Sequence, residues 1–222
     1  MPTGYKIRHL TVKLLQCHGK QHIHPNSGFS LLEVIAVMAI IGILSGIIFP
    51  SWLAFVDRQR LNKVGDEVLS AIRRAQTQAQ NTKNNYSVSF RVNSSDIPEY
   101  IVYQGYPTTT NPSSGWTTLG NDLGLKSRQV FLYTNLTSLI SPTAYNTRDS
   151  NDIVTTTTGS GTITFNDLGV LANKTGTVAD TPLKVMLSIP QTTSSEASDI
   201  RYCVIIQTLI GAMQTAKDTN CQ

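Results

Sequence analysis

The stretch Gly28-Phe29-Ser30-Leu31-Leu32-Glu33, followed by an apolar run from Val34 to Val56, decides how this chain is organised. The run holds no charged residue over 23 positions. At about 1.5 Å per helical residue it would be about 34 Å long, enough to cross a hydrocarbon core of about 30 Å. We therefore expect a long helix whose first part spans a membrane.

Two features set this stretch apart from a plain single-span anchor, which is the alternative interpretation. Glu33 places a carboxylate beside the apolar run, where a lone charge costs about 2.5–3.5 kcal/mol and needs a role or a partner. Residues 1–28 are basic and lack an apolar core, whereas a secretory signal carries its apolar segment before the cleavage site. Here the candidate site, Gly28, precedes the apolar segment.

Helix-weakening residues also punctuate the run. Gly42, Gly46 and Pro50 are residue types common in membrane helices, and Pro50 would soften or kink this one.

Together these residues closely resemble the class III signal of type IV prepilins and type II secretion pseudopilins. The resemblance implies that a prepilin peptidase cleaves between Gly28 and Phe29 and methylates the new Phe29 amine. It implies that Glu33 neutralises the N-terminus of a neighbouring subunit inside an apolar bundle, where unpaired charge is costly. Pro50 would let the helix bend or locally melt during assembly.

The same resemblance implies partners and a location. The helix would anchor the protein in membrane lipid and then pack with other pilins or pseudopilins in a helical filament, through an inner-membrane assembly platform. We expect a single-pass protein of the bacterial inner membrane with a periplasmic globular domain, or a subunit of a surface filament. The expected segments are a cleaved leader at 1–28, a transmembrane and filament-core helix at 29–56, and an amphipathic helix leading into a globular domain at 57–222.

Charge and histidine content narrow the function classes. The chain has 18 basic and 14 acidic residues, and the leader holds four of the basic ones (Lys6, Arg8, Lys13 and Lys20), so residues 29–222 are neutral overall. This weakens an argument for a nucleic-acid surface. All four histidines precede Gly28, which disfavours histidine-dependent catalysis and most zinc sites. We expect no enzyme activity, cofactor or metal, and we interpret Cys17 with the leader histidines as leader sequence.

Two cysteines, Cys203 and Cys221, remain after the leader. In an oxidising compartment they could form a bridge worth about 3 kcal/mol, and two free thiols are the alternative. Many true pilins have such a terminal disulfide loop, which often faces outward. A bridge that only holds the chain end against the sheet is the other possibility.

Periodicity predicts an α+β fold in which a long N-terminal helix packs against an antiparallel sheet. The helix should run from Phe29 to about Lys83, with an apolar stripe along its second half. Its members are Leu61, Val64, Val68, Ala71/Ile72, Ala75 and Ala79. Strands are expected at 86–92, 100–103, 129–133, 162–165, 184–189 and 201–207. Residues 104–124, 134–160 and 190–199 are expected to be loops, the last two exposed.

Three short segments resemble GspH/FimT-type minor pilins and pseudopilins. They are the helix-to-strand passage that begins at 69–79, the strand and turn at 163–169, and the final strand and glycine turn at 203–211. Some FimT-type pilins bind DNA through arginines after that glycine, but Gly211-Ala212-Met213-Gln214 has none. Because DNA affinity requires several phosphates to be neutralised together, DNA binding is unsupported here. A DNA-binding or adhesive tip pilin and a major structural pilin remain alternatives.

Overall fold

The computed structural model describes residues 28–108, 112–138, 143–174, 176–191 and 196–221, without the side chains of 47–51. Residues 1–27 lie outside this description, so the expected leader and its cysteine and histidines are not covered. The chain divides into two compact units, Met1–Ile47 and Ile48–Gln222.

One helix, α1 (Leu31–Thr82), occupies the predicted position. It begins two residues after the expected start and ends where Lys83 takes a positive φ of 55°. Within the second unit, the predicted apolar stripe is buried along its whole length. Its members are Leu61, Val64, Val68, Ala71, Ile72, Ala75 and Ala79, each at most 3% exposed. The three-four spacing therefore identified the face that packs.

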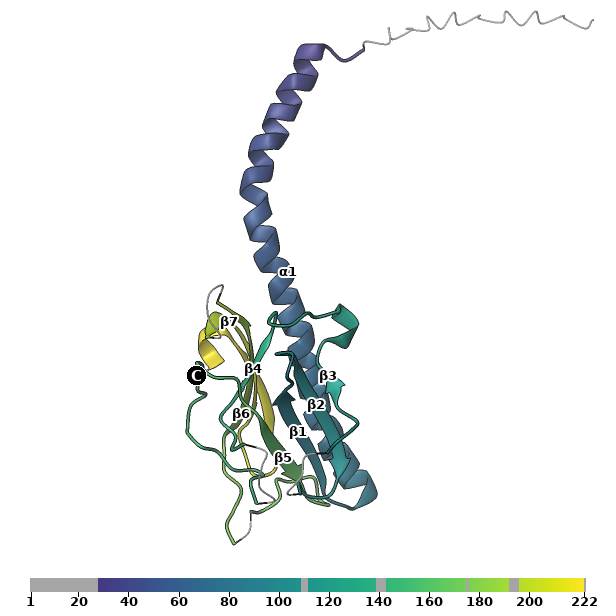
Figure 1. Cartoon of the computed structure of the whole chain (residues 1–222), viewed down its shortest axis with the longest axis vertical. Coiled ribbons are helices and arrows are strands. Elements are labelled where there is room, and N and C mark those ends of the chain that lie inside the picture. The colour runs from purple at the N-terminus through teal and green to yellow at the C-terminus, as the bar shows by residue number, and fades with distance from the viewer. Residues whose placement is uncertain (1–27, 109–111, 139–142, 175, 192–195, 222) are drawn as a thin grey trace, which may run out of the picture. The chain divides into compact units, whose positions relative to one another are not determined.

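The strands form two antiparallel sheets rather than the single sheet that we expected (Figure 1). The first has the order β3-β2-β1-β5 and the second the order β4-β6-β7-β8. The first consists of β1 (Tyr86–Val92), β2 (Pro98–Gln104), β3 (Thr117–Thr118) and β5 (Gly161–Phe165). The second consists of β4 (Phe131–Thr134), β6 (Leu183–Pro190), β7 (Ala197–Ile206) and β8 (Met213–Lys217). Two short 3-10 helices, η1 (Asn121–Leu123) and η2 (Asp218–Cys221), complete the described elements.

Both sheets contribute to one core around the stripe of α1. Alternate residues of β1 and β5 (Val88, Phe90, Ile163 and Phe165) and of β6 and β7 (Val185, Leu187, Tyr202, Val204 and Ile206) belong to it. The opposite face of the second sheet forms a smaller core that contains Phe131, Tyr133, Met186, Cys203, Ile205 and Cys221. Because burial of each large apolar side chain contributes about 1.5–3 kcal/mol, these contacts hold helix and sheets together.

Two expectations about the loops were wrong. Residues 134–160 are not uniformly exposed, because Leu136, Tyr145 and Asn146 are buried. The Asn146 side chain donates hydrogen bonds to the carbonyls of Thr164 (2.7 Å) and Ala172 (2.8 Å). Residues 197–199, expected in a loop, belong to β7. The expected loop at 104–124 contains only the short elements β3 and η1.

Candidate functional site

The N-terminal motif lies at the start of α1. Ser30 precedes the first helical residue, and its carbonyl accepts hydrogen bonds from the amides of Glu33 (3.0 Å) and Val34 (3.2 Å). Ser30 is therefore the N-cap, a position that serine favours, and Glu33 is in the first turn, where a carboxylate complements the helix dipole.

Glu33 is exposed and has no ion-pair partner among the described residues. No described residue therefore supplies a charge that would neutralise it in an apolar bundle. A Cβ added at Gly28 would meet no described atom within 4 Å. Neither packing nor a positive φ requires a glycine at this position.

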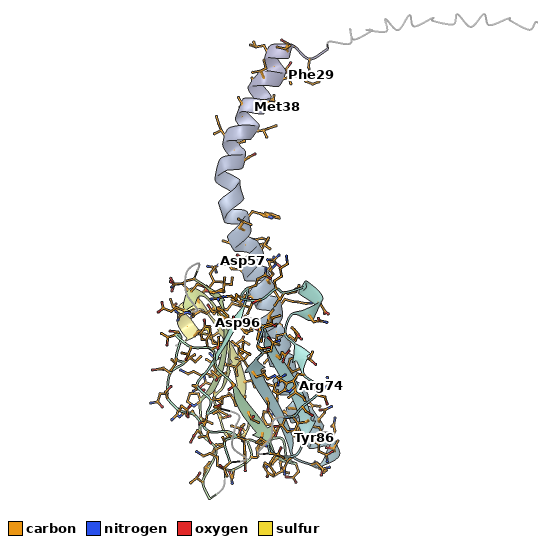
Figure 2. All side chains as sticks on the ribbon, in the orientation of Figure 1. Phe29, Met38, Asp57, Arg74, Tyr86 and Asp96 are labelled. Carbon is orange, nitrogen blue, oxygen red and sulfur yellow. A yellow bond between two sulfur atoms is a disulfide. The ribbon has the colours of Figure 1, made fainter. Side chains whose placement is uncertain are left out.

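The first turns of α1 present apolar side chains all round. Phe29 is 82% exposed and Met38 is 65% exposed, and both side chains project from the chain in Figure 2. Leu31, Leu32, Val34, Ile35, Val37, Ile40, Ile41, Ile43 and Leu44 are likewise exposed. A helix that is apolar on every side normally packs against other helices or lipid.

Two glycines in this part of α1 gain a meaning that the sequence interpretation missed. Gly42 and Gly46 are four residues apart, so they share a helix face, and a Cβ at either would meet nothing within 4 Å. Each glycine costs the helix about 1 kcal/mol relative to alanine, and no described residue provides a close contact that would require it. The spacing of small residues is the one that lets helices approach closely in membranes. The nearby Ser45 hydroxyl donates to the Ile41 carbonyl (2.7 Å), which satisfies it within the helix.

The expected membrane span meets a different finding. Among the described residues, no helix is long and apolar enough to cross a membrane. The side chains of residues 47–51, Pro50 among them, lie outside the described residues, although the backbone of α1 is helical there. The expected effect of Pro50 on the helix is therefore not tested.

The C-terminal cysteines form the expected bridge, between Cys203 of β7 and Cys221 of η2, with a Cα–Cα distance of 5.6 Å. Both residues are at most 2% exposed and belong to the smaller core. Of the two possibilities for this bridge, the buried position favours one that holds the chain end against the sheet. An outward-facing binding loop is not supported.

Asp218 reinforces this attachment. Its carboxylate pairs with Arg58 of α1 (3.1 Å) and accepts a hydrogen bond from the Arg201 amide (3.2 Å). The end of the chain is thus connected to both α1 and β7.

Three of the seven basic residues in 57–91 lie close to acidic side chains of the same chain. Arg58 pairs with Asp218, and Arg60 approaches Asp57 at 3.7 Å. Arg91 pairs with Glu99 at 2.9 Å and lies over the Trp116 ring. These cations are partly neutralised by the chain's own acids, so DNA binding gains no support. In the part of the chain that the structure describes, there is also no cluster of three or more metal-ligating side chains.

Polar contacts position α1 against the sheets at two further points. The Tyr202 hydroxyl donates to Asp66 (2.7 Å), and burial followed by the nearby Asp66 carboxylate raises the pKa of Tyr202 to about 12. On another side of the helix, the Glu67 carboxylate accepts a hydrogen bond from the Gly120 amide (2.7 Å). Burial raises the pKa of Glu67 despite this bond. These are structural contacts rather than a reactive site.

Comparison with known proteins identifies the N-terminal segment. Residues 23–49 match the family model of the prokaryotic N-terminal methylation motif. No curated protein and no solved structure shows significant similarity to the chain. The motif supports a type IV pilin-like protein that is processed by a prepilin peptidase and assembles with other pilins. It implies attachment to a membrane or a place in a surface filament, and a structural rather than an enzymatic role.

Proposed function

We propose that this chain is a minor pilin or pseudopilin, a subunit of a type IV pilus or of a type II secretion-like filament. The observation that carries the proposal is the methylation motif, in which Gly28, Phe29 and Glu33 stand in the order that a prepilin peptidase would recognise. The fold gives no reason for a glycine at position 28, so recognition by another protein accounts for it better than packing does.

The helix supports the same function. Its first half has exposed apolar side chains and a glycine pair with open space around it among the described residues, while one face of its second half packs in the globular core. A neighbouring helix in a filament, or lipid before assembly, would cover the first half. Glu33 would pair with the methylated amine of Phe29 in the next subunit.

The GspH/FimT-type assignment is a finer part of the proposal. Its supports are β5 with the turn that ends at Gly169, and β7 with the turn that ends at Gly211. Both glycines adopt a positive φ, 77° and 79°, as such turns require.

Cleavage is the first test. The chain is expressed with and without a prepilin peptidase, and the mass of the product is measured. The wild type should lose residues 1–28 and gain a methyl group, whereas Gly28→Leu should keep the precursor mass. Gly42→Ala, which alters an equally open glycine, should be cleaved normally. A wild-type mass that does not depend on the peptidase would contradict the proposal.

Assembly is the second test. Glu33→Gln keeps the shape of the side chain but removes its charge, so it should enter the membrane yet be recovered poorly in sheared filaments. Normal recovery would refute the pairing of Glu33. The amount of wild-type protein relative to the dominant subunit then assigns its role. A trace in filaments supports a minor pilin, parity supports a major pilin, and a membrane-only protein that copurifies with secretion components supports a pseudopilin.

A further inference from the structure

The sheet edges of the globular unit are protected to very different degrees. The β5 edge is covered by chain segments, because the Asn146 amide bonds to the Thr162 carbonyl (3.1 Å) and the Ala172 amide to the Thr164 carbonyl (2.9 Å). At the β4 edge, the Leu132 carbonyl accepts a hydrogen bond from the Gly159 amide (2.9 Å). The β3 edge is only two residues long. Covered or short edges are how proteins prevent unwanted strand pairing.

The fourth edge, β8, is different. It is five residues long, and among the described strands it pairs with β7 alone. The Gln207 amide donates a hydrogen bond to the Ala212 carbonyl. In an antiparallel pair every second residue forms such bonds, so Gln214 and Ala216 are the residues of β8 whose backbone groups bond to β7. The backbone groups of Met213 and Thr215 therefore point away from the sheet. No proline or bulge interrupts β8, and Gln214, Thr215 and Lys217 are exposed.

A cation without an ion pair among the described residues lies on this open edge. The Lys217 ammonium is 5.5 Å from the centre of the Tyr202 ring, and the charge of Arg73 on α1 acts to lower the pKa of the same tyrosine. Neither cation forms an ion pair within the described residues. The neighbouring acids are already engaged, Asp218 with Arg58 and Asp66 with the Tyr202 hydroxyl.

The opposite end of the edge is apolar. Met213 is half buried against the main core, and Ile210, three residues before it, is 70% exposed. The turn that carries Ile210 is held in place, because Gln76 reaches its carbonyl at 3.5 Å and the Leu171 amide bonds to the Leu209 carbonyl at 2.8 Å. The exposed side chain is thus presented on a fixed support, which favours binding.

We propose that β8 is a docking edge for an extended segment of another polypeptide, which adds to the second sheet as a fifth, antiparallel strand. The segment carries a carboxylate opposite Lys217 and an apolar side chain opposite Met213. Main-chain hydrogen bonds supply affinity in this mode of recognition, and alternate side chains supply specificity. The proposal does not depend on the assignment to a pilus or secretion filament.

A second copy of this chain fits the edge less well. Parallel pairing in register would place Lys217 beside Lys217, and like charges directly opposite each other are unfavourable. The direction of α1 beside β8 is fixed, because Arg58 contacts one end of the β8 region and Gln76 the other. If two copies paired their β8 strands antiparallel, their α1 segments would therefore run in opposite directions. Under the proposed function, two such copies could not both enter one filament in the same direction, so this exclusion of a second copy rests on that function.

Peptide binding to the full chain in detergent micelles tests the proposal. The probe is a fluorescein-labelled peptide with the core Glu-Thr-Val-Thr-Ile, followed by fluorescence anisotropy. Thr215→Pro removes an outward amide without removing a main-chain hydrogen bond to β7, and it should weaken binding at least about tenfold. Thr215→Val is the matched control, because it loses the same hydroxyl but keeps the amide, and it should bind like the wild type. A peptide with Lys in place of Glu should bind more weakly, with the difference reduced by salt.

Amide hydrogen exchange gives a second measurement on the wild-type chain. Saturation with the peptide should slow exchange at Met213 and Thr215 and leave Gln214, which already bonds to β7, little changed. No saturable binding up to about 1 mM, or equal binding to the Thr215→Pro and Thr215→Val variants, would overturn the proposal. If the probe fails but the chain dimerises and Thr215→Pro abolishes the dimer, a second copy occupies the edge and the proposal is likewise overturned.

Discussion

Replacement of Gly65 by alanine should destabilise the globular unit, although the substitution improves the intrinsic helix propensity of α1. Gly65 is a buried position of α1, directly against the ring of Tyr202. A Cβ added there would lie closest to Cδ1 of that ring and 2.5 Å from Cε1 and Cγ. The ring cannot move away freely, since Tyr202 is only 4% exposed and its hydroxyl is bonded to Asp66 at 2.7 Å.

Two opposing effects set the magnitude. Alanine is favoured over glycine inside a helix by about 1 kcal/mol. An extra methyl in a well-packed core costs about 1–3 kcal/mol through side-chain and backbone displacement. The displaced group here is a fixed aromatic ring, so we expect the upper part of that range and a net loss of about 1–2 kcal/mol. For a folded unit of this size, such a loss lowers the melting temperature by roughly 2–8 °C.

Urea unfolding of the full chain in detergent, followed by tyrosine fluorescence, measures the change in free energy. The decisive comparison is a double-variant cycle, because Tyr202→Ala removes the obstructing ring. In that background Gly65→Ala should become stabilising by up to about 1 kcal/mol. Gly42→Ala is the matched control, because a Cβ there meets nothing within 4 Å, and it should leave the globular unit unchanged. If Gly65→Ala were equally stabilising with and without the Tyr202 ring, the packing argument would be refuted.

Three further predictions concern the bridge and the titrating groups. Cys203→Ser should lower the free energy of unfolding, measured in urea, by about 3 kcal/mol, since it opens a bridge with a sequence separation of 18. Cys17→Ser, which lies in the expected leader, is the control and should have no such effect. Burial raises the pKa of Tyr202 and of Tyr133 from 10.0 to about 12, so the folded chain keeps protons that the unfolded chain releases. The free energy of unfolding should therefore fall as pH rises from about 10 towards 12. Tyr202→Phe should reduce this loss, measured by alkaline unfolding. Burial raises the pKa of Asp180, but hydrogen bonds from Lys174 and the Arg148 amide outweigh this effect and leave the pKa below its usual 3.8. The stabilisation that the ionised carboxylate gives above pH 3.8 should disappear as pH falls through the lowered pKa. Asp180→Asn should show less acid destabilisation, measured by thermal unfolding.

Local patterns predicted the elements whose burial is strongly periodic. The stripe on α1 identified the face that packs, because its periodicity places apolar residues on one side. The alternation in β1 located the core residues Val88 and Phe90, but Ser87 and Ser89 on the other face are buried as well. The strand β8 was missed because it lacks such a pattern. Its sequence, Met-Gln-Thr-Ala-Lys, has no apolar alternation, and as an edge strand it buries few side chains. Nothing in five such residues distinguishes them from a polar tail.

The number of sheets could not be deduced, because pairing between distant strands leaves no local signal. β1 pairs with β5 across about 70 residues of sequence, while β4, which lies within that interval, joins the other sheet. Asn146 shows a related difficulty. An asparagine in a segment rich in Ser, Thr and Asn normally indicates an exposed loop. Here the side-chain amide of Asn146 donates hydrogen bonds to the Thr164 and Ala172 carbonyls, and the residue is completely buried.

The N-terminal motif was the most predictable part, since it is linear and depends on no distant contact, and the methylation motif covers Gly28, Phe29 and Glu33. The roles of these three residues in cleavage, methylation and pairing stay predictions. The disulfide was foreseen only as one of two outcomes, because spacing in sequence does not supply the geometry that a bridge needs.

The glycines of α1 show why the two halves of one helix need different explanations. Gly65 is required by this chain, because Tyr202 occupies the space that a side chain would take. Gly42 and Gly46 each weaken the same helix by about 1 kcal/mol, yet no described atom lies within 4 Å of a Cβ added at either position. A destabilising residue without an internal contact is best explained by a contact with another molecule. The same explanation applies to an exposed carboxylate beside an apolar surface. Gly42, Gly46 and Glu33 therefore agree with the proposed function, in which neighbouring subunits pack against the first half of α1, whereas the buried stripe of the second half packs within the globular unit.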